Sequence, residues 1–289
     1  MKRIITIQDI SCVGKCSLTV ALPIISAMGI ETAVLPTAVL STHTAFSDFT
    51  FRDLTDDIAP ICAHLKDQQF AFDAIYTGYL GSFKQLELMA RMFSDFGSTQ
   101  TLLFVDPCMA DNGALYPGFT EAFARAMASL AGKAQVMVPN RTEASYMLGI
   151  PYRADGYDEA YIKDMLKKLA ALGTRQVILK GVEFAGDQET ITGVAGKIGI
   201  MAYDAATDRF SSYFHEKLPT SFHGTGDIFA SVCVGALLRG WPLEAAYTLA
   251  ADYVVAAIKV TISHPDYNWY GVDVEAVIPY LVQRLAEQR

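Results

Sequence analysis

The sequence has no basic run and no excess of positive charge. Its 289 residues include 23 Lys and Arg against 31 Asp and Glu, which gives a net charge of −8 at pH 7. Nucleic-acid binding depends on Lys and Arg that neutralise phosphates, so we expect no nucleic-acid partner. The charge does not exclude a nucleotide, because a few backbone amides and one Lys can form a local anion site.

Cysteines are few, and none are paired in sequence. Their number is odd and no two have C-x-x-C spacing, which argues against a disulfide framework and against a zinc site. Free thiols fit a reducing cytoplasm, and we expect the protein to be cytoplasmic. The five cysteines are Cys12, Cys16, Cys62, Cys108 and Cys233.

Long apolar runs are also missing. The first residues contain too short an apolar stretch for a signal peptide, and we find no run of about 18 apolar residues, so we expect no membrane partner. No stretch resembles a linker or an internal repeat. Hydrophobic residues make up 52% and charged residues 19% of the chain, which excludes a disordered protein. We therefore expect one large domain over residues 1–289.

Short β-type runs alternate with longer amphipathic ones. We expect strands at 4–7, 32–39, 74–76, 101–105, 135–138 and 176–179, and an antiparallel section at 191–203 and 211–216. We expect helices at 17–28, 55–68 with Thr55 as a possible cap, 83–93, 118–130, 142–148, 159–172, 226–238, 243–261 and 274–286. This order predicts an α/β fold with a mostly parallel central sheet and helices on both faces.

Polar residues follow three of the predicted strands. Asp106, Asn140 and Lys180 each stand where a strand is expected to end. Ligands of such sheets bind beyond the carboxyl ends of the strands. These three residues are therefore candidates for a binding site on position alone.

The segment Gly224-Thr225-Gly226-Asp227 opens an apolar helix. The glycines let the backbone approach a ligand closely, and the helix start offers unpaired N–H groups and a positive dipole end. Phosphate would repel Asp227, so the carboxylate makes sense if it faces an alcohol and accepts its proton as a P–O bond forms. The other interpretation is an ordinary loop with a helix cap.

Gly-Thr-Gly-Asp at this place in a chain of this length resembles the ribokinase superfamily. Further segments, in the same order, resemble its pyridoxal/pyridoxamine kinase branch. They are Ile7-Gln8, Ser41-Thr42-His43-Thr44, Thr77-Gly78-Tyr79-Leu80-Gly81-Ser82, Asp106-Pro107-Cys108-Met109 and Pro139-Asn140-Arg141-Thr142-Glu143. The resemblance covers nearly the whole chain. It implies a single-domain ribokinase-like three-layer sandwich that phosphorylates the 5′-hydroxymethyl group of a vitamin B6 vitamer with ATP.

The resemblance also implies roles for single residues. Gly224, Thr225 and Gly226 would form an anion hole, with Asp227 as the catalytic base. Asn140 and Glu143 would organise magnesium and phosphates, and the residue that matches Asp106 lies near both. By its position at a predicted strand end, Lys180 is either a phosphate contact or a solvated strand terminus. Asp106 and Glu143 are the candidate residues at a Mg²⁺ cofactor, which prefers oxygen ligands. A monovalent cation is a further candidate cofactor.

On the substrate side, Ser11, His43 and Tyr79 match or lie near positions that contact the vitamer ring. An aromatic can stack on a pyridine, and a hydroxyl or imidazole can hydrogen-bond its polar groups. Residues 106–116, with Asp111, Gly113 and Tyr116, resemble a flap that would exclude water from the reaction.

The sequence departs from this pattern around the ring pocket and the flap. Asp9 stands where many pyridoxal kinases have Ser, and Gly14-Lys15-Cys16-Ser17 replaces a run that commonly ends in Gly-Asn. Cys108 and Ala110 replace frequent Val and Gly. The 14–17 run is not a phosphate-binding P-loop, because Asp9 stands at its first glycine and Cys16 follows the Lys. Cys108 is a reactive thiol or, more commonly for a cysteine, an inert one.

Two other functions stay open from the sequence. One is a hydroxymethylpyrimidine kinase of the same superfamily, whose substrate ring is similar. The other is a non-catalytic protein that binds a nucleotide or vitamin B6 on the kinase fold, because a fold alone does not fix a function. The intact Asp227 with its glycines argues against the second. Relatives in the family are commonly homodimers, so we expect a homodimer.

Overall fold

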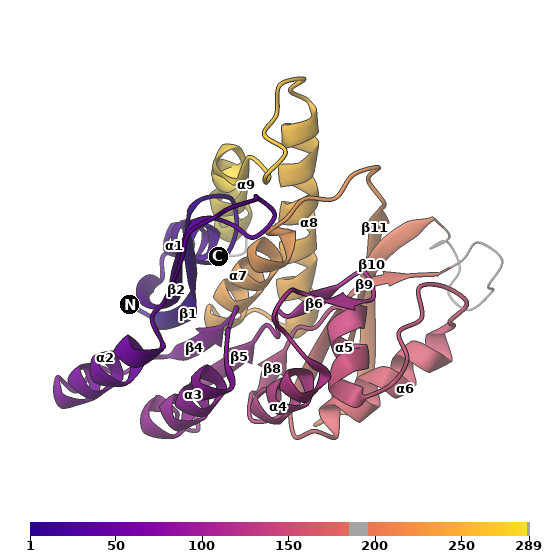
Figure 1. Ribbon diagram of the computed structural model, residues 1–289. Helices are drawn as coiled ribbons and strands as arrows, with labels where there is room; N and C mark the ends of the chain where they lie inside the picture. Colours follow the sequence, from indigo (N-terminus) through magenta and orange to yellow (C-terminus); the bar gives the residue numbers. More distant parts are fainter. Residues whose placement is uncertain (185–195, 288–289) are drawn as a thin grey trace. The chain divides into compact units, whose positions relative to one another are not determined.

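The computed structural model describes residues 1–184 and 196–287 (Figure 1). The chain forms two compact units that are each assembled from separate stretches of sequence. Unit 1 consists of Met1–Leu80, Met92–Thr101 and Leu218–Arg289, and unit 2 of Gly81–Arg91 and Leu102–Lys217. One domain over residues 1–289 stays a prediction.

Unit 1 contains four strands in the order β4-β1-β2-β3. They are β1 (Arg3–Val13), β2 (Glu31–Thr42), β3 (Phe51–Asp53) and β4 (Ala74–Thr77). β1 runs parallel to β2 and β4, and β3 is antiparallel to β2. Most of β1 is buried, as expected of a parallel strand that is covered on both faces.

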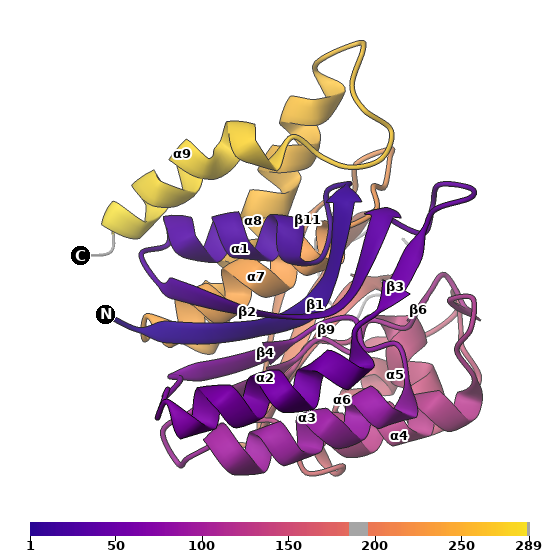
Figure 2. The ribbon, with the colours of Figure 1, turned by 60° about the vertical axis from the view of Figure 1, so that its left-hand side comes forward.

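Helices cover both faces of these strands. In Figure 2, α1 (Leu18–Ala27) and α9 (Val274–Ala286) lie on one face of β1 and β2, and α2 (Thr55–Asp67) lies on the other. α7 (Thr225–Leu238) packs between α1 and α8 (Leu243–Ile262). Every residue of α7 from Asp227 to Ala236 is buried, so it is the central core helix of unit 1.

The helix α8 ends one residue later than predicted, at Ile262, and is long and apolar. By length and composition alone, it is the one helix in the described parts of the chain that could cross a membrane. Core helices pass the same test, and half of its apolar stretch is buried. It packs against α7 and α9, and the Tyr253 hydroxyl donates to the Val274 carbonyl at 3.0 Å.

Unit 2 contains five strands in the order β11-β10-β9-β8-β5. They are β5 (Leu102–Val105), β8 (Val136–Met137), β9 (Gln176–Glu183), β10 (Lys197–Asp204) and β11 (Arg209–Glu216). β5, β8 and β9 are parallel, whereas β10 and β11 are antiparallel to their neighbours. The parallel strands bring the residues that follow β5 and β8 to one edge.

Helices α4 (Glu121–Ala131), α5 (Arg141–Leu148) and α6 (Glu159–Ala170) pack in sequence in unit 2, and α5 and α6 contact β9. A small hairpin of β6 (Ala110–Asp111) and β7 (Ala114–Leu115) contacts α5. The remaining helix, α3, spans Phe83–Phe96.

The predicted α/β fold with a mostly parallel sheet is confirmed, and two local predictions are wrong. Thr55 does not cap α2: it is the first helical residue, and its N–H donates to Asp53 at 2.7 Å. Lys180 does not end its strand, because pairing with β10 extends β9 to Glu183. Part of the predicted strand at 191–203 lies outside the described residues, since β10 begins at Lys197.

The buried face of α1 allows a test of the core of unit 1. Ile24 is 0% exposed, so Ile24→Ala should lower the free energy of unfolding by about 2–5 kcal/mol through the lost apolar contacts and the cavity. Leu22, 40% exposed on the same helix, is the matched control, and Leu22→Ala should change it by less than about 1 kcal/mol. Equal losses in urea unfolding would contradict the assigned faces of α1.

Candidate active site

The Gly-Thr-Gly-Asp loop packs its backbone directly on another loop of unit 1. Gly224 is the N-cap of α7, with φ +84°, and a Cβ there would lie 1.8 Å from the Lys15 carbonyl oxygen. Both observations require glycine at this position. The Thr225 hydroxyl donates to the Phe222 carbonyl at 3.1 Å, which closes the turn. The predicted loop before the helix is therefore present and tightly held.

Asp227 lies in the first turn of α7 and is buried. Its Oδ2 accepts a hydrogen bond of 3.0 Å from the backbone N–H of Ser17, which is far away in sequence. The first-turn amides of any helix lack intrahelical acceptors and carry a partial positive charge. A carboxylate held in one orientation beside such amides can take a proton from an alcohol while the amides stabilise a phosphoryl group.

A second buried carboxylate, Asp9, lies beside this group. Its Oδ1 accepts from the Ser17 hydroxyl at 2.6 Å and its Oδ2 from the Ser11 hydroxyl at 3.2 Å. Burial raises the pKa of Asp9, and the hydrogen bonds from the two serines partly counter that effect. Ser11, a predicted substrate contact, is thus bound to Asp9. The sequence noted Asp9 only as a departure and missed Ser17, which stands in the second departing run.

His43 is fixed by backbone atoms through both ring nitrogens. Its Nδ1 accepts from the Ala45 N–H at 3.2 Å, so the proton lies on Nε2, which donates to the Tyr270 carbonyl at 2.8 Å. His43 is only 2% exposed, and its ring packs against His223 with centroids 4.4 Å apart and against Phe46 at 5.0 Å. The role of His43 as a substrate contact stays a prediction.

The sequence also missed His223, the residue directly before the glycine loop. Its ring packs on His43 while part of the residue remains exposed. Burial of the ring, with repulsion from His43, lowers the pKa of His223 to about 4, so it is neutral at pH 7. The remaining substrate candidate, Tyr79, follows β4, and its carbonyl accepts from the Thr37 hydroxyl at 3.2 Å.

In unit 2, the predicted phosphate and metal residues gather where β5 and β8 end. Lys180 Nζ pairs with Asp106 Oδ1 at 3.0 Å, and both side chains are largely buried. Asn140 and Lys180 are joined by a parallel β-bridge, and the Asn140 amide donates to the Ala110 carbonyl at 2.8 Å. Four sequence candidates, Asp106, Asn140, Glu143 and Lys180, therefore lie in one cluster of this unit.

Glu143 has a structural role as well as a buried carboxyl group. It forms a capping box with Asn140 at the start of α5: Glu143 Oε2 accepts from the Asn140 N–H at 2.7 Å, and Asn140 Oδ1 accepts from the Glu143 N–H at 2.9 Å. Burial raises the pKa of Glu143 to about 8, a rise that Lys180 counters and Asp106 reinforces. Burial also raises the pKa of Asp106, and the two carboxylates raise that of Lys180.

These residues fit a magnesium ion that also binds phosphate oxygens and waters, and not a metal ion that is held by protein side chains alone. In residues 1–184 and 196–287, no three His, Cys, Asp or Glu side chains gather to hold a metal by themselves. Mg²⁺ in nucleotide-dependent enzymes is usually bound by one or two carboxylates together with phosphates and waters. Asp106 and Glu143, close enough for their charges to interact, match that donor set.

The segment that resembles a flap is the hairpin β6–β7 with its flanks. Asn112 and Gly113 form its tip with positive φ, and the Gly113 N–H donates to the Thr142 hydroxyl at 3.0 Å. The Tyr116 N–H donates to the Met109 carbonyl at 2.9 Å, which closes the base. Cys108 is partly exposed just before the hairpin, and its N–H donates to the Asp106 carbonyl.

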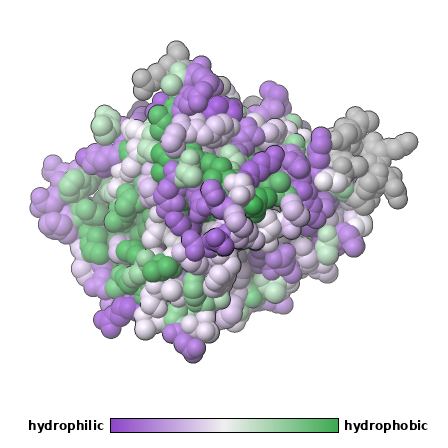
Figure 3. All heavy atoms as spheres, turned by 90° about the horizontal axis from the view of Figure 1, so that it is seen from above, coloured by the Kyte–Doolittle hydropathy of each residue, from purple (hydrophilic) through white to green (hydrophobic). Residues whose placement is uncertain are grey.

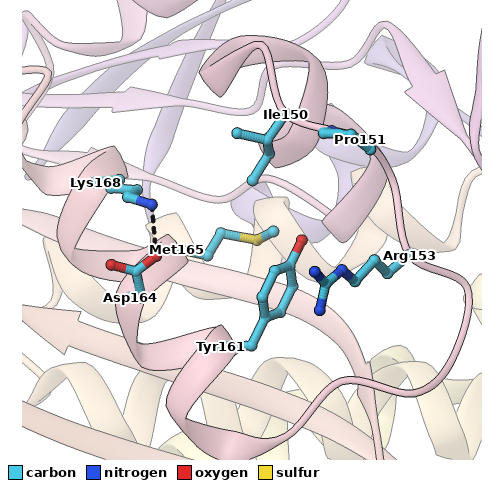
Figure 4. A pocket seen from close by; sticks show the side chains of 7 residues that line it. All are labelled: Ile150, Pro151, Arg153, Tyr161, Asp164, Met165 and Lys168. Carbon is cyan, nitrogen blue, oxygen red and sulfur yellow. Dashed lines mark ion pairs between the residues drawn. The ribbon is translucent and has the colours of Figure 1, made fainter.

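Unit 2 also contains a cavity of about 250 Å³, which other residues of this unit line (Figure 4). It lies between the segment after α5 and one side of α6, where Asp164 and Lys168 form an ion pair of 2.7 Å. Its lining includes none of the predicted site residues: it consists of Ile150, Pro151, Arg153, Tyr161, Asp164, Met165 and Lys168. We therefore do not assign the reaction to this cavity.

The raised pKa of Glu143 predicts how stability depends on pH. Between about pH 4.5 and pH 8, the folded chain keeps a proton on Glu143 that the unfolded chain releases. The free energy of unfolding should therefore fall as pH rises through this window, by up to about 1.4 kcal/mol per pH unit. Glu143→Gln should flatten this dependence in urea unfolding without magnesium. An unchanged slope would contradict the assignment.

Comparisons with known proteins agree with this fold and these motifs. A family model described as phosphomethylpyrimidine kinase matches residues 23–269. The crystal structure of pyridoxal kinase from Lactobacillus plantarum has a TM-score of 0.86 and 30% identity, and the match covers 100% of this chain and 99% of that chain.

Two further proteins point the same way. A Bacteroides thetaiotaomicron VPI-5482 protein, solved as a candidate phosphomethylpyrimidine kinase in a form with pyridoxal, has a TM-score of 0.89 and 38% identity, with 97% and 95% of the two chains covered. The pyridoxine/pyridoxal/pyridoxamine kinase of Bordetella avium is 28% identical over 267 residues, which are 89% of this chain and 85% of the relative. The match over residues 23–269 and these long similarities show that this chain is a kinase of the phosphomethylpyrimidine kinase family and of its pyridoxal kinase branch.

Proposed function

We propose that this kinase transfers the γ-phosphoryl group of ATP to the 5′-hydroxymethyl group of a vitamin B6 vitamer. The observation that carries the proposal is the buried carboxylate of Asp227 in the first turn of α7, held by the Ser17 N–H at 3.0 Å directly after the glycine loop. That arrangement suits an alcohol acceptor and a phosphoryl donor. The names of the relatives above supply the substrate class.

The substrate alcohol has a pKa far above 7, so it keeps its proton until the reaction begins. Asp227 accepts this proton as the oxygen attacks phosphorus, and the bond between the γ-phosphorus and the leaving ADP oxygen breaks. Backbone amides of Gly224, Thr225 and Gly226 form the anion hole for the transferring group. Their positions are set by the αL conformation of Gly224 and by the start of α7.

The cluster in unit 2 serves the nucleotide. Lys180 supplies a positive charge for the phosphates, and its pairing with Asp106 holds the ammonium group in place. Asn140 and Glu143 fix the start of α5 through the capping box. Asp106 and Glu143 would hold Mg²⁺, which neutralises charge on the phosphates when it is bound. A monovalent cation is a further proposed cofactor. The segment 106–116 would exclude water, since hydrolysis of ATP competes with transfer.

A second candidate substrate is hydroxymethylpyrimidine. The description of the matching family as phosphomethylpyrimidine kinase is the observation that favours it. Its reacting group is also a hydroxymethyl on a six-membered nitrogen ring, so Asp227 and the glycine loop would act in the same way. The difference between the two candidates lies in the contacts to the ring.

We also propose that the protein is a cytoplasmic homodimer. Apolar side chains reach the surface, as the green atoms among the purple in Figure 3 show for one face. Val13, which pairs with Thr42 of β2, and Phe51, which pairs with Leu40 of β2, lie near one another at one end of these strands of unit 1, and each is 50% exposed. A short edge strand such as β3 next to exposed apolar side chains suits an isologous contact with a second copy.

The substrate proposal predicts which compound is phosphorylated. With ATP and magnesium, the protein should convert pyridoxal, pyridoxamine or pyridoxine to the 5′-phosphate, read by mass spectrometry. Asp227→Asn should lower kcat by about 10²–10⁴-fold, because general-base catalysis contributes that much. Asp252→Asn, which removes a carboxylate of unit 1 paired with Arg284, is the control and should leave kcat nearly unchanged.

Each other result has a distinct meaning. Conversion of the pyrimidine alone would replace the vitamer with the second candidate and keep the mechanism. Full activity of Asp227→Asn would overturn the role of Asp227. Binding of ATP and vitamer with no product from either compound would overturn the proposed reaction.

The dimer proposal predicts a mass in solution of about twice the 31.5 kDa chain by analytical ultracentrifugation. Phe51→Asp should give the monomer, because an unpaired carboxylate buried in the contact is costly. Phe70→Asp, also in unit 1 and 41% exposed, should leave the dimer intact. A monomeric wild type, or a dimeric Phe51→Asp variant, would contradict this interface.

A further inference from the structure

The run Gly14-Lys15-Cys16-Ser17 departs from the family pattern, and the proposed reaction uses only the Ser17 N–H from it, which holds Asp227. In the structure it packs closely against neighbouring segments of unit 1. A Cβ on Gly14 would lie 2.7 Å from the His43 ring, and one on Gly271 would lie 2.3 Å from the Lys15 side chain. A Cβ on Gly224 would likewise overlap the Lys15 carbonyl oxygen, so the segments around His43, Gly224 and Gly271 all pack tightly against the run.

Ser17 has an unusual backbone for a residue with a side chain. Its φ of 51° and ψ of −135° lie in a region that glycine adopts readily and other residues avoid. Ser17 is the N-cap of α1, a position where serine commonly caps the helix, yet its side chain makes no capping hydrogen bond. Its hydroxyl instead donates to Asp9 and its N–H to Asp227. Both hydrogen-bond donors of this residue therefore point to carboxylates.

Asp9 is placed for this contact by an irregularity in β1. The pairing of β1 with β2 shifts register between Gln8 and Ile10, and such bulges re-aim a side chain. The Asp9 side chain is 6% exposed, and the partners that the structure gives it are the hydroxyls of Ser17 and Ser11. Burying a carboxyl on neutral partners costs stability, so its presence calls for a reason beyond packing.

We propose that Ser17, anchored by Asp9, is a positioning residue that fixes the orientation of the Asp227 carboxylate. The hydroxyl bond of 2.6 Å holds Ser17 in its strained conformation, and that conformation directs the N–H to Asp227 Oδ2. The inference rests on the proposed role of Asp227 as the base. This role explains why the backbone of Ser17 is strained, why the Asp9 carboxyl is buried and why the Ser17 side chain does not cap α1.

A purely structural role for Ser17 makes a different prediction. If the residue only supported the fold, its loss would lower stability and activity together. If it positions Asp227, its loss lowers kcat and leaves the fold and substrate binding intact. Glycine at position 17 separates the two roles, because it removes the hydroxyl that holds the conformation without adding strain, so the N–H is free to turn away from Asp227 while the fold is kept.

The first experiment is therefore Ser17→Gly. We expect kcat to fall about 10- to 100-fold, since a misplaced catalytic group costs that much, with both KM values within about threefold of wild type. The thermal midpoint should stay close to wild type, because relief of strain offsets the lost hydrogen bond. A kcat within about twofold of wild type would overturn the proposal, as would a fall in kcat matched by a marked fall in the thermal midpoint.

The second experiment asks whether Ser17 acts through Asp227. In the Asp227→Asn background, adding Ser17→Gly should cost no further activity, because there is no carboxylate base left to position. Equal losses in both backgrounds would overturn the proposal. If Asp227→Asn alone keeps full activity, the proposed function fails first, so the two failures can be told apart.

Variants of Asp9 and a matched serine complete the test. Asp9→Ala should lower kcat as much as Ser17→Gly, and Asp9→Asn should retain more, because its amide oxygen can still accept from the Ser17 hydroxyl. Ser231→Ala also removes a buried hydroxyl, one that donates to the main-chain carbonyl of Asp227 at 2.6 Å rather than to its carboxylate. Its effect on kcat should be below about threefold. Equal effects of Ser231→Ala and Ser17→Gly would overturn the specific role of Ser17.

Discussion

The contact between the backbone of Gly224 and the carbonyl of Lys15 constrains the rest of the site in unit 1. A side chain at position 224 would overlap that oxygen, with a Cβ only 1.8 Å away, so two segments from opposite ends of the chain can meet only at a glycine. This contact sets the start of α7 beside the loop that precedes α1. The Ser17 N–H then reaches Asp227, and the Ser17 hydroxyl reaches Asp9. The orientation of the proposed base thus depends on close backbone packing.

In unit 2, the order of the parallel strands places the ionisable residues close together. Parallel strands bring residues that follow β5 and β8 to one edge, where Asp106 and Asn140 meet Lys180 of β9. Burial alone would favour the neutral forms of Asp106, Glu143 and Lys180; the attraction between Lys180 and each carboxylate opposes this, whereas the two carboxylates repel each other. Glu143 belongs both to the cap of α5 and to this cluster, so the stability of the helix and the proposed binding of phosphate and magnesium depend on one residue.

The sequence predicted what local patterns determine. Hydrophobic periodicity predicted most helices and strands, and glycine spacing predicted the loop before α7. Positions at the ends of predicted strands singled out Asp106, Asn140 and Lys180, and the resemblance to pyridoxal kinases added Glu143. The sequence could not predict contacts between distant segments: Ser17 with Asp227, His223 with His43, or the pairing with β10 that extends β9 past Lys180. In the sequence, Ser17 is an ordinary serine before a helix. Its backbone strain and its hydrogen-bond partners arise only in the folded chain, so the sequence could not indicate its role.

The central claim is that the Asp227 carboxylate accepts the proton of the vitamer's 5′-hydroxyl. A crystal structure of the protein with pyridoxal, magnesium and a non-hydrolysable ATP analogue tests it most directly. The account predicts an Asp227 carboxylate oxygen within about 2.6–3.2 Å of the 5′ oxygen, with the γ-phosphorus on the other side of that oxygen. A 5′ oxygen bound to another base, beyond hydrogen-bond reach of Asp227, would contradict it.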